Sequence, residues 1–98
     1  MTITKALDGE KLTINLEGRL DTTTSPELEK ELNDSLGSVK ELVFDFSKLE
    51  YISSAGLRVL LSAQKMMNDK GGMKVTNVNE IVQEVFEVTG FSDILTIE

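Results

Sequence analysis

The sequence of 98 residues contains no cysteine and no histidine. The chain therefore has no thiolate nucleophile, no imidazole base and no ordinary set of zinc ligands. The lack of cysteine also excludes a disulfide framework, which is compatible with a cytoplasmic protein. Because these absences remove the commonest catalytic groups, we expect a protein that is not an enzyme and that holds no cofactor.

Long apolar runs and an excess of positive charge are also missing. No stretch is long and apolar enough to span a bilayer, and Met1–Lys5 lacks the apolar core of a signal peptide. Ten Lys and Arg residues face seventeen Asp and Glu residues, so the formal net charge is -7. Acidic surfaces are repelled by nucleic acid and by anionic lipid. We expect neither direct nucleic-acid binding nor membrane insertion.

What is present is typical of one folded domain. Hydrophobic residues make up 40% and charged residues 28% of the chain, as in globular proteins. The length is close to the commonest domain size, so we expect a single domain over residues 1–98. No glycine-rich phosphate-binding loop is found. Ser62 and Lys65 match the S-x-x-K motif of some hydrolases, but they lie in a helical pattern and are interpreted as helix surface.

The first quarter of the chain predicts a β-hairpin. Thr2–Leu7 resembles a strand, and Asp8-Gly9 is a tight-turn signal. Between Leu12 and Leu20, apolar residues alternate with polar ones, which predicts a second strand with one buried face. These two strands are expected to pair with each other.

Three helices are expected after the hairpin. For the first helix, Ser25 is the predicted N-cap, Pro26 suits the first helical position, and Gly37 is the expected stop. Leucines at every fourth position from Leu28 to Leu36 predict its buried stripe. The second helix follows Ser53-Ser54, and apolar residues on more than one stripe predict that it is the most buried of the three.

The third helix is expected to begin after Asn79 as its N-cap and to end at Gly90. Its glutamates are interpreted as a solvated face. The residues predicted to face inward are Ile81, Val82, Val85, Phe86 and Val88.

Between the helices lie further strands. Glu41–Phe46 carries a continuous apolar run, which predicts a central strand covered on both faces. Met73–Asn77 and Ile94–Ile97 predict two short strands. The order β-β-α-β-α-β-α-β favours an α/β fold with parallel strands after the hairpin, because strand–helix–strand crossovers, which are almost always right-handed, imply parallel neighbours.

Polar residues follow two of the parallel strands. Asp21 and Thr22 follow the second strand, and Ser53-Ser54 follows the third. Since neighbouring parallel strands end at the same edge of a sheet, we expect these residues to form one surface cluster. That edge is where ligands and partners usually bind in open α/β sheets.

The adjacent serines allow two interpretations. One serine is enough to cap a helix. If Ser53 is the cap, the Ser54 hydroxyl lies near solvent at the positive end of the helix dipole, where a phosphate is tolerated. Ser54 is then either a phosphorylation site or simply part of the helix start. Gly56 likewise either admits a partner's backbone or reflects packing of the helix on the sheet.

Four stretches together resemble the STAS domain family, in particular the small bacterial anti-sigma factor antagonists. They are Gly18–Asp21, Phe44–Ser47, Tyr51–Leu57 and Val88–Phe91. The resemblance covers nearly the whole chain. It implies a STAS-like α/β fold with a mixed, mostly parallel sheet of four to five strands, an N-terminal hairpin and three to four flanking helices.

The resemblance also implies a function. Such antagonists bind an anti-sigma factor that is a serine kinase of the GHKL type, are phosphorylated by it and released, and are reset by a serine phosphatase. In this way they regulate transcription that depends on a sigma factor. The family's switch segment reads Asp-Ser-[Ser/Thr]-Gly-Leu-Gly, which puts the phosphate acceptor on Ser54. The aspartate position holds Ser53, Ala55 replaces the second hydroxyl, and Arg58 replaces the final glycine.

The residues expected to bind the partner are Asp21, Thr22, Ser53, Ser54, Gly56, Leu57 and Arg58. Arg58 lies four residues after Ser54, so it either pairs with a phosphate there or is a solvated helix charge. Two alternatives remain open within the same family. The chain could be a constitutive structural subunit of a membrane lipid-transport or sensory complex, or a STAS domain that senses a nucleotide.

Overall fold

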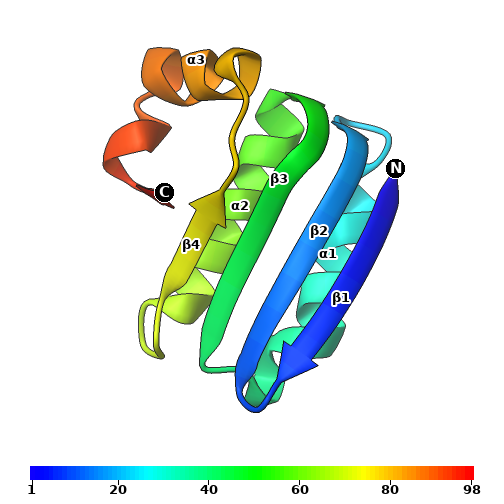
Figure 1. Ribbon diagram of the computed structural model, residues 1–98, viewed down its shortest axis with the longest axis vertical. Helices are drawn as coiled ribbons and strands as arrows, with labels where there is room; N and C mark the ends of the chain where they lie inside the picture. Colours follow the sequence, from blue (N-terminus) through cyan, green and yellow to red (C-terminus); the bar gives the residue numbers. More distant parts are fainter.

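Five strands lie side by side in chain order, β1-β2-β3-β4-β5, and helices pack against the sheet (Figure 1). The computed structural model describes residues 1–98. The strands are β1 (Thr2–Asp8), β2 (Lys11–Leu20), β3 (Glu41–Ile52), β4 (Met73–Thr76) and β5 (Thr96–Ile97). The helices are α1 (Ser25–Ser35), α2 (Ser54–Met67) and α3 (Glu80–Thr89), with 3-10 turns η1 (Leu36–Ser38) and η2 (Phe91–Asp93). The predicted order of elements is confirmed.

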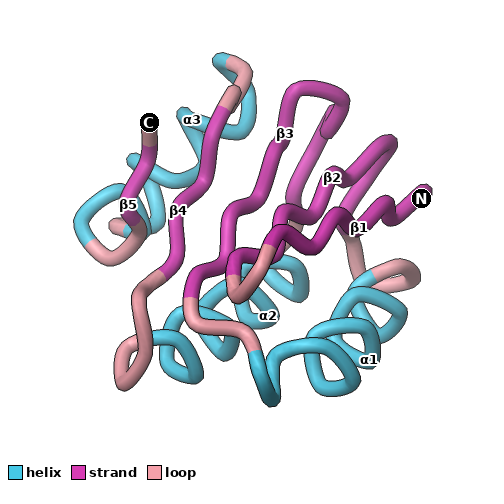
Figure 2. Tube along the Cα trace, turned by 60° about the horizontal axis from the view of Figure 1, so that its bottom comes forward, coloured by secondary structure: helices cyan, strands magenta, loops and turns pink.

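The sheet is mixed and mostly parallel, as predicted. β1 and β2 form the antiparallel hairpin, which turns through Gly9 in a left-handed conformation at φ 62°. β2, β3, β4 and β5 all run parallel. Because each right-handed crossover moves one strand in the same direction, α1 and α2 fall on the same face of the sheet (Figure 2).

The expectation that β3 is covered on both faces is wrong. The strand is also longer than predicted and runs to Ile52. Along it Leu42 and Phe44 are buried, whereas Val43 and Asp45 are only partly covered. The physical reason is the strand order, which places both neighbouring helices on one face and leaves the other face open (Figure 2).

The core is one cluster of 23 buried apolar residues between the sheet and the helices. Phe44 and Phe46 contribute to it from β3, and their ring centroids are 5.6 Å apart in a tilted arrangement. Phe86 extends the cluster to α3 and is fully buried. α2 buries more of its residues than α1 or α3, which confirms the prediction for the second helix. Met66, at its end, is 38% exposed.

Two expectations for α1 are wrong. Thr24, not Ser25, occupies the N-cap position, and its side chain makes no capping hydrogen bond. Ser25 is buried, and its hydroxyl donates to the carbonyl oxygen of Asp21 at 2.5 Å. The helix ends at Ser35, before Gly37, because η1 tightens the last turn. Pro26 does lie in the first turn, as predicted.

α3 begins and ends as predicted. The Asn79 side chain accepts a hydrogen bond from the Val82 N–H at 2.8 Å, and Gly90 closes the helix in a left-handed conformation at φ 82°. The inward assignment of Ile81 and Val88 is wrong, since they are 59% and 80% exposed. α3 buries only one narrow stripe against the rest of the chain. The last strand is shorter than predicted because η2 precedes it. None of the helices combines the length and the apolar character needed to cross a lipid bilayer.

Candidate functional site

The ends of β2 and β3 define the candidate site. In the parallel register Leu20 lies opposite Ile52. The Ser53 N–H donates to the Leu20 carbonyl oxygen at 2.9 Å, which continues the pairing beyond the last strand residues. Asp21 and Ser53, the next residues along the two strands, therefore lie next to each other. The expected cluster at the carboxyl edge is present.

The two serines occupy different positions. Ser53 is the N-cap of α2, with extended backbone (φ -100°, ψ 176°), and its hydroxyl accepts a long hydrogen bond of 3.5 Å from the Gly56 N–H. Ser54 is the first residue of the helix and is exposed. The positive end of the α2 dipole lies at this position, which favours negative charge. Only the second serine is thus free for chemistry at the surface.

Asp21 is held by the turn that leads into α1. Its Oδ1 accepts hydrogen bonds from the N–H groups of Thr23 at 3.0 Å and Thr24 at 3.1 Å. The hydrogen bond from the Thr24 N–H is the largest effect on the pKa of Asp21 and lowers it. Desolvation, the second-largest effect, raises the pKa, but the Thr23 N–H, the Thr24 hydroxyl and the charge of Arg19 lower it further, so the net shift is downward. Asp21 therefore stabilises the turn that precedes α1, and it carries a fixed negative charge at the edge.

Arg19 belongs to this edge, although the sequence did not identify it as a binding residue. Its guanidinium carbon lies 4.7 Å from the centroid of the Tyr51 ring, and its Nε lies 3.9 Å from Oδ2 of Asp21. Such exposed cation–π contacts stabilise by about 0.5–1 kcal/mol. The pairing of Arg19 with Tyr51 follows a register shift after Gly18. Sequence periodicity does not reveal such a shift, so this pair was missed.

Gly56 and Leu57 do not belong to the exposed part of the site. A Cβ atom on Gly56 would lie 2.8 Å from Cγ of Leu20 and 2.9 Å from Cγ1 of Ile52. The glycine is therefore explained by close packing of α2 on the strand ends. Leu57 is only 5% exposed and belongs to the core. The expectation that these two residues contact a partner is corrected, because both lie in the interior and position the serines.

Arg58 lies at the surface beside the serines. It lines an open groove of about 540 Å³ between α1 and α2, to which Thr22 and Ala55 also contribute. Ser62 and Lys65 line the same groove and are exposed on α2, consistent with their interpretation as helix surface. Arg58 takes part in none of the four ion pairs of the chain. Its guanidinium is thus available to an anionic group.

The arrangement at this edge matches the one that the sequence resemblance implies, with an acidic residue beside an exposed serine at a helix start. The model of the STAS domain family matches residues 2–98. The chain belongs to the STAS domain family. Ser53–Arg58, which the resemblance aligns with the family's switch segment, lie at the start of α2.

Several curated relatives of this STAS domain are close in sequence. BtrV of Bordetella bronchiseptica is 36% identical over 84 residues, which cover 84% of this chain and 72% of BtrV. The anti-sigma F factor antagonist of Paenibacillus polymyxa is 30% identical over 89 residues, covering 88% of this chain and 76% of that protein.

Solved structures share the fold. An anti-sigma factor antagonist from Mycobacterium paratuberculosis superposes with a TM-score of 0.89 at 22% identity, covering 98% of this chain and 83% of that one. SpoIIAA of Bacillus in its phosphorylated form gives a TM-score of 0.76 at 18% identity, covering 99% of this chain and 91% of that one. At these identities the superpositions establish the STAS fold.

Proposed function

We propose that this STAS domain is an anti-sigma factor antagonist, a binding module without catalytic activity. It captures an anti-sigma factor that is a serine kinase of the GHKL type, and so releases a sigma factor for transcription in the cytoplasm. The observation that carries this proposal is the exposed Ser54 at the start of α2, directly after Ser53, which lies next to Asp21 at the carboxyl edge of the sheet. The relatives support it, because the Paenibacillus polymyxa protein is named an anti-sigma F factor antagonist, and a Bacillus subtilis protein that is 29% identical over 85 residues is named an anti-sigma-B factor antagonist.

Phosphorylation of Ser54 is the proposed switch. A phosphate adds about -1.5 to -2 charges and three strong acceptor oxygens. Since Ser53 caps the helix and Ser54 is exposed, the modification leaves the core untouched. The added charge lies at the same sheet edge as the ionised Asp21, so this edge becomes more negative and repels a partner that binds the unmodified form. A serine phosphatase then restores binding. SpoIIAA, a protein of the same fold, has a solved structure in a phosphorylated form, which supports phosphorylation as the switch.

The proposed contact surface consists of Asp21, Thr22, Ser53, Ser54 and Arg58. Thr22 and Arg58 extend it from the serines into the groove between α1 and α2. It carries one negative charge, on Asp21, and one positive charge, on Arg58. A kinase that binds here must place its active site over Ser54, so binding and phosphorylation use the same surface.

The test is a pull-down from lysate of the native cell, with the tagged wild type, Ser54→Ala and Ser54→Asp as baits, with and without ATP. We expect the wild type and Ser54→Ala to capture a GHKL-type kinase, and Ser54→Asp to lose it. Added ATP should release the kinase from the wild type alone, with phosphate located on Ser54 by mass spectrometry. The matched control is Ser38→Asp in η1, which adds the same charge at another exposed serine and should behave as the wild type.

Two other outcomes of these experiments would contradict the proposal. If all baits hold one partner regardless of ATP, the switch is absent and the domain is a constitutive structural subunit. If nucleotide binds the isolated protein at micromolar concentration and no kinase is captured, a nucleotide-sensing role replaces the proposal.

A further inference from the structure

The outer surface of α3 carries two large apolar side chains where solvent should favour polar residues. Ile81 is 59% exposed and Val88 80% exposed, the latter more than any other large apolar residue of the chain. They are seven residues apart, close to two helical turns, so they lie on the same side of α3. Ile94, just after η2, is 48% exposed as well. Val82 and Phe86 form the separate stripe that α3 buries in the core.

Neither the fold nor the helix explains these two exposed side chains. Ile81 and Val88 are β-branched, and such residues have lower helix propensity than the unbranched alternatives. They contribute little burial, and water does not favour them. Single exposed apolar residues are common on protein surfaces. Two on one side of a short helix, bordered by charges of one sign, are instead typical of a contact surface.

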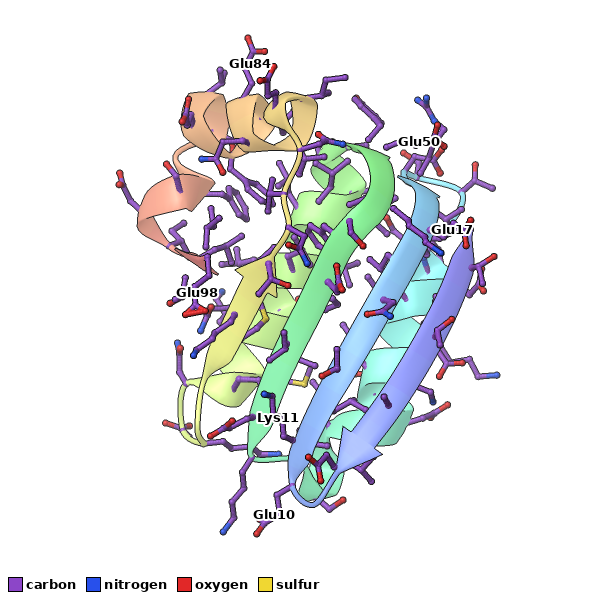
Figure 3. The ribbon with its side chains drawn as sticks, viewed as in Figure 1. Glu10, Lys11, Glu17, Glu50, Glu84 and Glu98 are labelled. Carbon is purple, nitrogen blue, oxygen red and sulfur yellow. The ribbon has the colours of Figure 1, made fainter.

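The part of the chain around Ile81 and Val88 is acidic, and few of its carboxylates are neutralised by ion pairs. Residues 75–98 include no Lys or Arg, and their acidic residues are Glu80, Glu84, Glu87, Asp93 and Glu98. Of these only Glu98 forms an ion pair, with Lys74 at 3.4 Å. In Figure 3 Glu84 extends outward from α3, away from the sheet.

Three of the glutamates gather on α3 itself. Glu80, Glu84 and Glu87 line one shallow hollow of about 470 Å³. Glu80 lies in the first turn, where the helix dipole favours it. Glu87 is near the C-terminal end, where the dipole disfavours a carboxylate, and Glu80 and Glu84 repel each other at four residues' spacing. Helix stability therefore does not explain this charge pattern either.

We propose that the α3 surface, formed by Ile81, Val88, Glu80, Glu84 and Glu87, docks a basic amphipathic segment of a partner protein. The apolar side of such a segment covers Ile81 and Val88, and its Lys and Arg residues pair with the three glutamates. Charge complementarity selects this occupant. A second copy would bring the same acidic surface against itself, and nucleic acid or an anionic membrane is repelled for the same reason.

The surface goes beyond the proposed serine switch, because it includes none of the five residues of that contact surface. The two nevertheless lie at the same end of the molecule. The Asn79 side chain donates from Nδ2 to the Leu49 carbonyl oxygen at 2.8 Å, which ties the start of α3 to the end of β3 (Figure 1). A test must therefore separate the α3 surface from the serine edge.

The experiment uses the full chain and a defined probe, a fluorescent amphipathic helical peptide made of Leu and Lys. A matched peptide carries Glu in place of Lys. Anisotropy should detect binding of the Lys peptide only, weakened by added salt. Chemical shift changes in amide NMR spectra should concentrate on residues 80–94. Ser54→Asp should leave the affinity unchanged, whereas it abolishes kinase capture in the pull-down, so the two proposals can fail separately.

Two variants assign the binding to this surface. Ile81→Ser combined with Val88→Ser should weaken the Lys peptide about tenfold, since it removes both apolar contacts. Leu7→Ser is the matched control, because Leu7 is 64% exposed on β1, away from α3, and it should bind as the wild type. Should the double variant unfold, Glu84→Gln with Glu87→Gln must show a comparable loss.

Three results would overturn the inference. The first is equal affinity for both peptides, and the second is shift changes outside residues 80–94. The third is a self-associating wild type, seen by sedimentation, that becomes monomeric in the Ile81→Ser/Val88→Ser variant. That last result would make a second copy the occupant.

Discussion

The backbone N–H of Ser53 is bonded to the carbonyl oxygen of Leu20 at 2.9 Å. This bond connects the end of β3 to the end of β2, and it brings Asp21 beside the start of α2. Two segments more than thirty residues apart thereby form one edge, with a carboxylate from one and two serines from the other. The proposed switch depends on this connection, because a phosphate on Ser54 adds its charge where Asp21 already carries one.

Replacement of Gly56 tests how closely the start of α2, where the proposed switch residue Ser54 lies, packs on the ends of β2 and β3. Gly56→Ala puts a Cβ 2.8 Å from Leu20 Cγ and 3.0 Å from the Leu20 carbonyl oxygen, so the start of α2 must shift. Overpacking of this kind costs about 1–3 kcal/mol, which exceeds the roughly 0.5–1 kcal/mol that alanine gains over glycine in a helix. We expect a lower free energy of unfolding in urea. Gly37→Ala is the control, since no atom lies within 4 Å of its Cβ, and it should be neutral or stabilising.

The two serines should differ in their effect on stability. Ser53→Ala removes the N-cap of α2 and should lower the free energy of unfolding by about 0.5–1 kcal/mol, at the lower end for a cap because the hydrogen bond is long. Ser54→Ala should stay within about 0.5 kcal/mol of the wild type, as exposed substitutions do. Urea titrations of both variants measure this. A larger loss for Ser54→Ala would give that serine a structural role.

Much of the fold follows from local signals in the sequence. The alternation of apolar and polar residues predicted β2. Asn79 as N-cap and Gly90 as the closing residue gave the two ends of α3, and the turn at Gly9 specified the hairpin. The carboxyl edge that joins Asp21 to Ser53 also followed, because neighbouring parallel strands end at the same edge of a sheet.

The errors arise where distant contacts or a competing local turn decide the structure. The apolar run of β3 predicted cover on both faces, but the strand order puts both neighbouring helices on one face. Ser25 looks like a cap in the sequence, yet the Asp21 side chain accepts the N–H bonds of this turn and Ser25 is buried. Gly56 permitted two interpretations until its neighbours Leu20 and Ile52 were known. The strand order and the contact of Gly56 with Leu20 join residues far apart in the sequence, whereas the Asp21 turn is local and offers more than one possible capping residue.

Acid should reveal the interactions of Asp21. Its pKa is lowered in the folded state, mainly by the Thr24 N–H, from an ordinary value of 3.8. The unfolded chain therefore binds the proton more readily, so ionised Asp21 stabilises the fold above that value. This contribution is lost as the pH falls through the lower folded pKa. We expect Asp21→Asn to be less stable than the wild type at neutral pH, and the difference to shrink below pH 3.8 in urea titrations. A difference that is constant with pH would contradict the assignment.

Arg58 should stabilise a phosphate on Ser54. The two residues are four positions apart on α2, a spacing at which helix side chains meet, and Arg58 has no ion-pair partner in the unmodified chain. An exposed pair of this type contributes about 0.3–0.5 kcal/mol, or roughly 0.2–0.4 unit in the second phosphate pKa. In protein with phosphoserine incorporated at position 54, a phosphorus NMR titration should give a higher phosphate pKa for Arg58→Gln than for the parent.

Lys65→Gln is the matched control for this titration. It removes one positive charge from the same helix and the same groove, but Lys65 lies about three turns from the phosphate. Its titration should coincide with that of the parent protein. If Arg58→Gln also coincides with the parent, Arg58 is a solvated charge, and any role it has lies in contact with the kinase. If Lys65→Gln shifts the pKa as much as Arg58→Gln, the effect belongs to the overall field of the groove rather than to a specific pair.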